Sequence, residues 1–577
     1  MPDPQVALGE IAGAAIEAAF GPRWSGTDPI VRPTANPEFG DFQINAAMSL
    51  AKALGRAPRE VAEAIVAHLP PGPQAGVEVA GPGFINVTLA DEWVAESVQA
   101  MAADSRLGVA SSAHPQTVVV DYSAPNVAKE MHAGHLRSTV IGDSLARLLE
   151  FLGHRVVRQN HVGDWGTPFG MLIEHLLDLG EAEAAHELSV GDLSTFYQQA
   201  RTKFDGDPGF AGRARQRVVA LQSGDPETLR LWRLLVDESN RYFRAVYDRL
   251  GVLLDDDDIA GESFFNDELT SVVAELEGLG LAVVDAGALC VFPPGFTGRD
   301  GEPLPLIVRK SDGGYGYAAT DLAALRHRVR DLGAERIAYV VGSPQAQHLA
   351  MVFAVATQAG WLGEKARAEH VGFGSVLGPD GKMLKSRAGT SVKLVELLDE
   401  AVERASSVVA AKNPQLGAEQ RADVARVVGI GAVKFSDLSS DRVKDYVFDW
   451  DRMLSFDGNT APYVQYAYVR LRSIIDRAGE VLSGPVVLEA PQERALALAL
   501  LAFDGVVRVA ADSFQPHRLA NYLFEVAQVG TAFVENCPVL RAETAELRAS
   551  RLVLCDVTSQ VLRTGLGLLG IDTVERM

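Results

Sequence analysis

The chain has little cysteine, no long apolar run and no excess of positive charge. Its three cysteines, Cys290, Cys537 and Cys555, stand far apart among 577 residues and show no CxxC spacing. We therefore expect no disulfide framework, no protein-bound zinc and a reducing, cytoplasmic location. No apolar run reaches the roughly 20 residues that a membrane-spanning helix needs. No basic start precedes an apolar block at the N-terminus, so we expect neither a secretory signal nor a membrane partner.

The charge balance limits the kind of nucleic-acid binding that the chain can use. A formal net charge of −22 argues against coating of nucleic acid without sequence preference. It leaves room for a nucleic-acid partner that docks on a local basic stripe.

The centre of the chain predicts a parallel α/β sheet. Thr117–Tyr122 is a continuous apolar run typical of a buried parallel strand. Helical periodicity follows over Gly134–Leu152, with Gly153 as the expected C-cap, and Arg155–Gln159 resembles the next strand. Strand, helix and strand in this order form half of a nucleotide-binding sheet. Further strands are expected at 288–292, 306–309, 337–341 and 370–373.

The flanking parts differ from the centre in composition. The first part combines predicted helices at 42–54 and 58–69 with a strand at 83–89, and the last part has almost no strand signal. A chain of this length exceeds one core. We predict the α/β class: a small N-terminal α+β domain, a Rossmann-type parallel-sheet catalytic domain with helical insertions, and a C-terminal all-α helical bundle. The expected bounds are 1–112, 113–440 with a helical insertion at about 181–251, and 441–577.

Two histidines stand where such sheets bind ligands, in the loop after the first central strand. His132, Gly134 and His135 open the following helix, whose N-terminal N–H groups attract phosphate. Gly134 lets the backbone approach a nucleotide closely, and the imidazoles donate to charge developing on a triphosphate. A chance tetrapeptide is the alternative, and the strand–loop–helix context argues against it. Metal ligation is weaker, because no third ligand has a recognisable spacing.

Lysines supply a second phosphate-handling feature. Lys382, Lys385 and Ser386 lie in a glycine-rich loop far downstream, and Lys129 directly precedes the histidines. Lysines on an exposed, mobile loop close over phosphates and neutralise the transferring group. Together with the histidines they predict an ATP-using enzyme that transfers adenylate.

The wider sequence resembles arginyl-tRNA synthetases, a family of class I aminoacyl-tRNA synthetases. The histidine motif followed by a KMSKS-like loop at 382–386 is the class I pattern. The segments 121–138, 161–170, 458–466 and 39–43 are similar to this family in particular. The resemblance runs from about Phe39 to Met577. Two departures are Ala124, where many members have serine, and the presence of both loop lysines beside Lys129, which leaves their division of labour open.

The resemblance implies a set of arginine-binding residues. Asp121 and Asn126 would contact the α-amino group and its surroundings, Tyr317 and Asp321 the guanidinium, and Gln345 would complete the pocket. A planar five-donor guanidinium suits a carboxylate such as Asp321. The alternative for Asp321 is an N-cap of a helix over 322–329, and both roles are compatible.

The resemblance also implies the partners. ATP enters with Mg²⁺, arginine activation requires bound tRNA(Arg), the N-terminal domain contacts the tRNA elbow, and the C-terminal bundle binds the anticodon. In the helix after Pro462, Tyr466, Arg470 and Arg477 share one face, which suits stacking on bases and phosphate contact. An ordinary solvated face is the equal alternative. We expect a monomer.

Two other functions remain open from the residues. A small-molecule nucleotidyltransferase shares the histidine motif but has no use for about 130 residues of helical bundle. A synthetase-like RNA-binding protein without catalysis would place no demand on the histidines and lysines.

Overall fold

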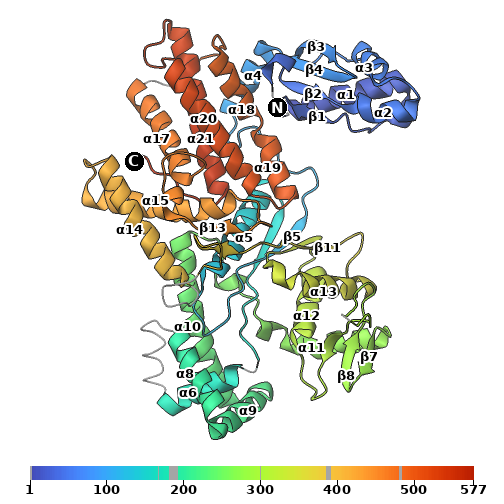
Figure 1. The fold of residues 1–577 in the computed structure, drawn as a ribbon, viewed down its shortest axis with the longest axis vertical. Coiled ribbons are helices and arrows are strands. Elements are labelled where there is room, and N and C mark those ends of the chain that lie inside the picture. The colour runs from blue at the N-terminus through green and yellow to red at the C-terminus, as the bar shows by residue number, and fades with distance from the viewer. Residues whose placement is uncertain are drawn as a thin grey trace. The chain divides into compact units, whose positions relative to one another are not determined.

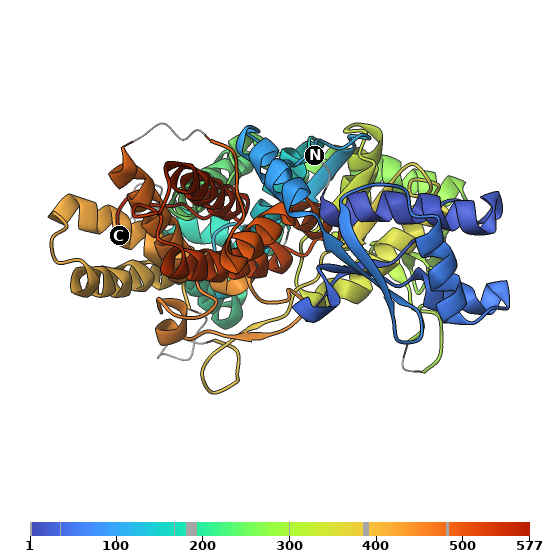
Figure 2. The ribbon, with the colours of Figure 1, turned by 90° about the horizontal axis from the view of Figure 1, so that it is seen from above.

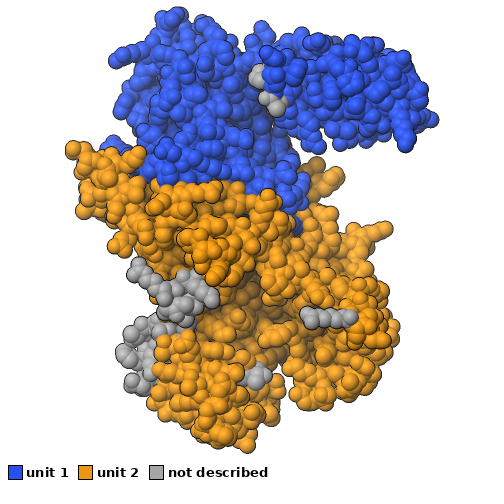
Figure 3. Space-filling view, in the orientation of Figure 1, with its two compact units in different colours: residues 1–111, 455–567, 572–577 blue, residues 112–454, 568–571 orange. Residues whose placement is uncertain are grey.

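The computed structural model describes residues 3–34, 36–166, 168–180, 193–298, 300–384, 392–479 and 484–577. Contacts divide these residues into two compact units, coloured in Figure 3. Unit 1 contains residues 1–111, 455–567 and 572–577, and unit 2 contains 112–454 and 568–571. The three predicted domain ranges stay a prediction, because this division follows contacts in space and joins segments from both ends of the chain.

A four-stranded parallel sheet lies at the centre of unit 2. Its order is β11-β10-β5-β6, and all three pairings are parallel. The three valines of β5 are fully buried, as a strand covered on both faces requires. The predicted strand–helix–strand unit is confirmed by β5 (Thr117–Asp121), α5 (Ala133–Phe151) and β6 (Arg155–Gln159). The other two strands are β10 (Arg336–Tyr339) and β11 (Arg367–His370).

Helices follow β6, in the lower part of Figure 1, and are called the insertion below. They begin before the predicted bounds of about 181–251, which stay a prediction, and residues 181–192 lie outside the described part of the chain. The helices pack through α6 against α8 and α9. They are α6 (Pro168–Leu179), α8 (Leu193–Gly206), α9 (Pro208–Gln222) and α10 (Pro226–Leu250).

A second group of elements leads from the insertion back to the sheet. An antiparallel sheet packs with α11 and α12 around a core that includes Phe265, Leu322 and Trp361. Near β11 in Figure 1, α12 and α13 lie side by side. The elements are α11 (Asn266–Gly278), β7 (Ala282–Asp285), β8 (Ala288–Val291), β9 (Leu306–Arg309), α12 (Tyr317–Arg330) and α13 (Ala346–Gln358).

Unit 2 ends in a short parallel strand pair and three helices. The pair joins β12 (Val376–Leu377) to β13 (Tyr446–Val447), across about 70 residues of sequence. Strand β13 lies in the last part of the chain, where the sequence has almost no strand signal, and its two residues carry too little pattern to predict. The helices are α14 (Leu394–Lys412), α15 (Ala418–Leu438) and α16 (Trp450–Met453).

Unit 1 contains an antiparallel sheet and a helical bundle. The sheet order is β1-β2-β4-β3. The C-terminal helices, orange to dark red in Figure 2, pack largely around α20. The elements are α1 (Pro4–Phe20), β1 (Val31–Pro33), β2 (Phe42–Ile44), α2 (Ala46–Leu54), α3 (Pro58–Ala67), β3 (Gln74–Ala80), β4 (Phe84–Leu89), α4 (Asp91–Ala102), α17 (Ala461–Ala478), α18 (Pro491–Leu501), α19 (Phe503–Asp512), α20 (His517–Asn536) and α21 (Ala545–Leu568).

Two predicted elements differ from the structure. The predicted helix 42–54 begins only at Ala46, because Phe42–Ile44 pairs with both β1 and β4. The predicted strand 370–373 lies at 367–370, where β11 pairs with β10 in parallel register.

Candidate active site

The loop from β5 to α5 leaves the sheet at its carboxyl edge and is held by its neighbours. Ser123, Ala124 and Ala128 have φ values of 73°, 47° and 59°, a left-handed conformation that costs energy in residues other than glycine. The Ala124 N–H donates to Asn160 Oδ1 (2.9 Å) and the Ala128 N–H to Ser239 Oγ (2.9 Å). Ser239 belongs to α10, so the insertion helps to fix the loop that carries the histidines.

The histidine pair is ordered by its own backbone. The Gly134 N–H donates to His132 Nδ1 (3.1 Å), and the His132 N–H donates to His135 Nδ1 (3.1 Å). Because each Nδ1 accepts, each neutral ring carries its proton on Nε2, the atom left to donate. A Cβ at Gly134 would lie 2.8 Å from His132 Cε1, so glycine is needed for this ring position.

Burial and nearby charge keep both rings neutral. Burial, then His132 and Lys129, lower the pKa of His135 to about 3. Burial and the Lys129 charge lower the pKa of His132 as well. Neutral rings retain Nδ1 as an acceptor and Nε2–H as a donor, so the arrangement offers two fixed donors rather than two acids.

The lysine loop meets the histidine segment through its backbone. Lys393 and His132 form an antiparallel bridge, the Ala133 N–H donates to Val392 O (3.2 Å), and the Leu394 N–H donates to Met131 O (2.8 Å). At the loop's other end, the Gly378 N–H donates to the carbonyl of exposed Lys382 (2.7 Å). Lys385 and Ser386 lie outside the described residues. The segment that follows them is therefore anchored to the histidine segment, and the one that precedes them folds back on itself.

Lys129 lies against the insertion. Its Nζ is 4.4 Å from the centre of the Tyr197 ring on α8, a cation–π contact. Its ammonium is therefore already stabilised before any phosphate arrives.

The predicted guanidinium residues gather at the start of α12 and α13. Tyr317 begins α12 and is 73% exposed, and Asp321 stands one turn further along. His348 Nε2 donates to Asp321 Oδ2 (2.6 Å), which raises the pKa of His348. Gln345 is exposed and directly precedes α13. The alternative N-cap role for Asp321 is wrong, because α12 begins at Tyr317 with Gly316 as its N-cap.

Glu262 joins this group, although sequence reasoning missed it. Burial, then the charges of Asp164 and Asp321, raise the pKa of Glu262 to about 8. Burial, then Glu262 and Tyr197, raise the pKa of Tyr317. Asp164, Glu262 and Asp321 thus stand close enough to one another for their negative charges to interact. No spacing in the sequence links residue 262 to residue 321.

The two remaining predicted residues lie on the loop side. Asp121 is buried, its Oδ2 lies 2.9 Å from Arg328 Nη2, and its Oδ1 has no hydrogen-bond partner among the described residues. One carboxylate oxygen is thus used inside the protein and one is left. Asn126 is exposed, and its backbone bridges to Gly163.

Comparisons with known proteins bear on the family of the chain. Residues 97–450 match the family model "tRNA synthetases class I (R), catalytic domain". Residues 7–89 match "Arginyl tRNA synthetase N terminal domain" and residues 464–577 match "DALR anticodon binding domain". The chain belongs to the arginyl-tRNA synthetase family. The predicted family, fold class and enzyme class, an aminoacyl-tRNA ligase, are confirmed.

Proteins that match this chain over essentially its whole length support its membership of the family. An arginine–tRNA ligase of Thermobifida fusca is 56% identical and covers 100% of both chains. One from Synechococcus elongatus is 50% identical over 98% of each chain. The crystal structure of the Plasmodium falciparum arginyl-tRNA synthetase matches with a TM-score of 0.87 at 29% identity, over 100% of both chains. The Thermus thermophilus enzyme matches with 0.84 at 27%, again over 100% of both.

The residues predicted to contact tRNA from their shared helix face lie on α17 in unit 1. Tyr466 is 47% exposed, with its ring 6.2 Å from that of Phe456. Arg470 Nη1 lies 3.3 Å from Glu535 Oε1, and Arg477 is exposed. The stripe is therefore accessible, and one of its two arginines already has an acidic partner.

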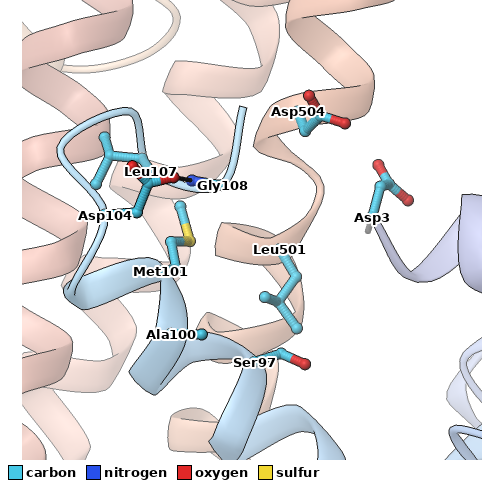
Figure 4. A pocket seen from close by; sticks show the side chains of 9 residues that line it. All are labelled: Asp3, Ser97, Ala100, Met101, Asp104, Leu107, Gly108, Leu501 and Asp504. Atoms are coloured by element: carbon cyan, nitrogen blue, oxygen red, sulfur yellow. Dashed lines mark hydrogen bonds between the residues drawn. The ribbon is translucent and has the colours of Figure 1, made fainter. Parts of the chain in front are cut away.

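Unit 1 also holds a pocket at the end of α4 (Figure 4). Each carboxylate that lines it serves the fold. Asp3 caps α1 by accepting from the Gln5 N–H, Asp104 accepts from the Gly108 N–H, and Asp504 accepts from Arg508. We assign the pocket no functional role.

One cluster of side chains has the spacing of a metal site. Among described residues, the group with ligand atoms close enough for a metal is Glu268, His327 and Asp331. His327 Nδ1 lies 2.8 Å from Asp331 Oδ2, and Arg326 lies 3.2 Å from Glu268, so internal hydrogen bonds and ion pairs account for it. No helix in the described ranges is long and apolar enough to cross a membrane.

Proposed function

We propose that this chain attaches arginine to tRNA(Arg) in two steps, using the residues gathered at the carboxyl edge of the β5–β10 sheet. An arginine carboxylate oxygen forms a bond to the α-phosphorus of ATP. The bond from that phosphorus to the bridging oxygen breaks, and pyrophosphate leaves with the electron pair. A terminal ribose hydroxyl of the tRNA then attacks the arginyl carbonyl, and AMP leaves.

The observation that carries the proposal is the backbone pairing of residues 131–133 with 392–394. It supports a shared task for two motifs that stand about 250 residues apart. His132 and His135 donate from Nε2 to the triphosphate, and Gly134 lets the protein backbone come close to the nucleotide. The leaving pyrophosphate is neutralised and held by Lys129, Lys382, Lys385 and Ser386. No side-chain nucleophile is required, and catalysis is positioning and charge stabilisation. Mg²⁺ enters with ATP as part of the substrate.

At the start of α12, Asp321 and Glu262 bind the guanidinium of arginine. Tyr317 and Gln345 line the pocket around this group. A planar cation among carboxylates gains charge-assisted hydrogen bonds, which favours arginine over neutral substrates. Asn126 and the free Oδ1 of Asp121 accept from the α-ammonium group.

Residues of unit 1 bind the tRNA. Tyr466 stacks on an unpaired base, and Arg470 and Arg477 contact phosphate. The N-terminal α+β part contacts the tRNA elbow. We further propose a cytoplasmic monomer that activates arginine only with tRNA bound.

The test is an arginine-dependent aminoacylation assay with total tRNA and the full-length chain. Charging with arginine that requires ATP is the expected result. Adenylate formation without any tRNA charging would favour the nucleotidyltransferase alternative. Tight tRNA binding with neither reaction would favour the non-catalytic alternative.

A further inference from the structure

Arg137 is a buried cation directly behind the histidine pair. It lies on α5 two residues after His135, and its side chain is 1% exposed. Burying a guanidinium is costly unless its charge and donors are satisfied. Its partners therefore show what the residue holds in place.

The partners of Arg137 come from later segments of unit 2. Its Nε donates to both carboxylate oxygens of Asp437 on α15, at 3.3 and 3.1 Å. Its Nη1 donates to Lys444 O (3.0 Å). The guanidinium lies 5.2 Å from the Tyr446 ring centre and 5.7 Å from that of Phe373.

Two of these partners stand at the base of the lysine loop. Tyr446 begins β13 and pairs with Val376 of β12. Phe373 lies three residues before β12 in the chain. From β12 the chain enters the loop directly, and it returns where the Leu384 N–H donates to Val376 O (3.0 Å). One guanidinium thus joins the helix that carries the histidines to the strand pair from which the lysines extend.

We propose that Arg137 is a positioning residue for adenylate formation: it sets the lysine loop against the histidine pair through Asp437, Phe373 and Tyr446. This inference rests on the proposed function, because it assigns the loop to pyrophosphate departure. A planar fork between two rings and a carboxylate fixes orientation as well as distance. A lysine keeps the charge and loses that orientation.

The two reaction steps separate this role from a purely structural one. Pyrophosphate leaves only in the first step, so a misplaced lysine loop slows activation and leaves transfer from preformed arginyl-adenylate unchanged. General destabilisation lowers both steps by the same factor, the folded fraction.

The experiment compares full-length Arg137→Lys with the wild-type chain. We expect kcat of tRNA-dependent ATP–pyrophosphate exchange to fall about 10- to 100-fold, as for loss of one transition-state contact. KM for arginine and single-turnover transfer to tRNA from added, chemically synthesised arginyl-adenylate should both stay within about twofold, since only the first step uses the loop. Equal losses in both steps, or unchanged exchange, would overturn the proposal.

Two further variants keep the test decisive. Arg336→Lys is the matched control: Arg336 is buried and pairs with Glu369 (2.6 Å), but it begins β10 at the amino edge of the sheet. It should leave both steps unchanged. If Arg137→Lys does not fold, Asp437→Asn removes the partner charge at constant shape and should also slow exchange selectively, with equal losses again contradicting the proposal. Absence of arginine-dependent exchange in the wild-type chain would instead contradict the proposed function itself.

Discussion

The starts of α5 and α12 use the same edge of one sheet for opposite electrostatic purposes. At α5, backbone N–H groups hold two imidazoles whose lowered pKa values keep them neutral, beside Lys129. At α12, Asp321 and Glu262 crowd together, and the pKa of Glu262 rises to about 8. The first place offers hydrogen-bond donors, which fits the proposed phosphate site, and the second offers carboxylates, which fits the proposed guanidinium site.

Burial shifts the pKa values on the two sides in opposite directions, and this has different consequences for substrate binding. Removing water lowers the pKa of a histidine and raises that of a carboxylate, so both groups become neutral in the free enzyme. A neutral imidazole is ready to donate. A protonated carboxyl must lose its proton to bind a guanidinium, so only the α12 side should couple substrate binding to pH.

The largest expected effect is on the α5 side. His135→Ala removes an Nε2 donor and should lower kcat of tRNA-dependent pyrophosphate exchange by about 10²- to 10³-fold, with KM for arginine nearly unchanged. His114→Ala, at an exposed position just before β5, is the control and should have no effect. A near wild-type exchange rate for His135→Ala would contradict the assigned role.

Changes on the α12 side should alter KM for arginine rather than kcat. Asp321→Asn keeps the shape and loses the charge, so KM for arginine should rise about 10- to 100-fold while kcat changes little. Steady-state exchange kinetics at varied arginine concentration measure both values. An unchanged KM would remove Asp321 from the guanidinium site.

The pH dependence sharpens the contrast. Below pH 8 the free enzyme holds Glu262 protonated, so arginine must displace that proton and binding should strengthen about tenfold per pH unit as pH rises toward 8. Calorimetry in buffers of different ionisation enthalpy should detect proton release on binding. Glu262→Gln should abolish the release; release that persists in this variant would assign the proton to another group.

The smallest expected effect lies outside both sides. Tyr466→Ala on α17 should raise KM for tRNA about fivefold, the lower end of base–aromatic stacking, and leave arginine affinity unaffected. Filter binding of tRNA(Arg) measures the first and calorimetry the second. A change in arginine affinity alone would show that the stripe on α17 acts otherwise than by holding tRNA.

Local patterns explain what the sequence could predict. The buried valines of β5, the periodicity of α5 and the histidine motif are each legible within a few neighbouring residues. Phe42–Ile44 was mistaken for helix because its strand state depends on pairing with segments elsewhere in the chain. Glu262, His348 and Arg137 were missed for the same reason: their partners Asp321 and Asp437 lie up to 300 residues away. The start of α12 was misplaced because Gly316 offers no side-chain cap.

Independence of the two sides is the central claim, and the double variant His135→Ala/Asp321→Asn tests it most directly. Tyr197 and Lys129 lie between them, so coupling through shared contacts is the physical rival. In tRNA-dependent pyrophosphate exchange, we predict that the double variant has the same kcat as His135→Ala alone. We also predict that its KM for arginine equals that of Asp321→Asn alone. A double variant no worse than either single variant, or one whose KM returns toward the wild-type value, would contradict the account.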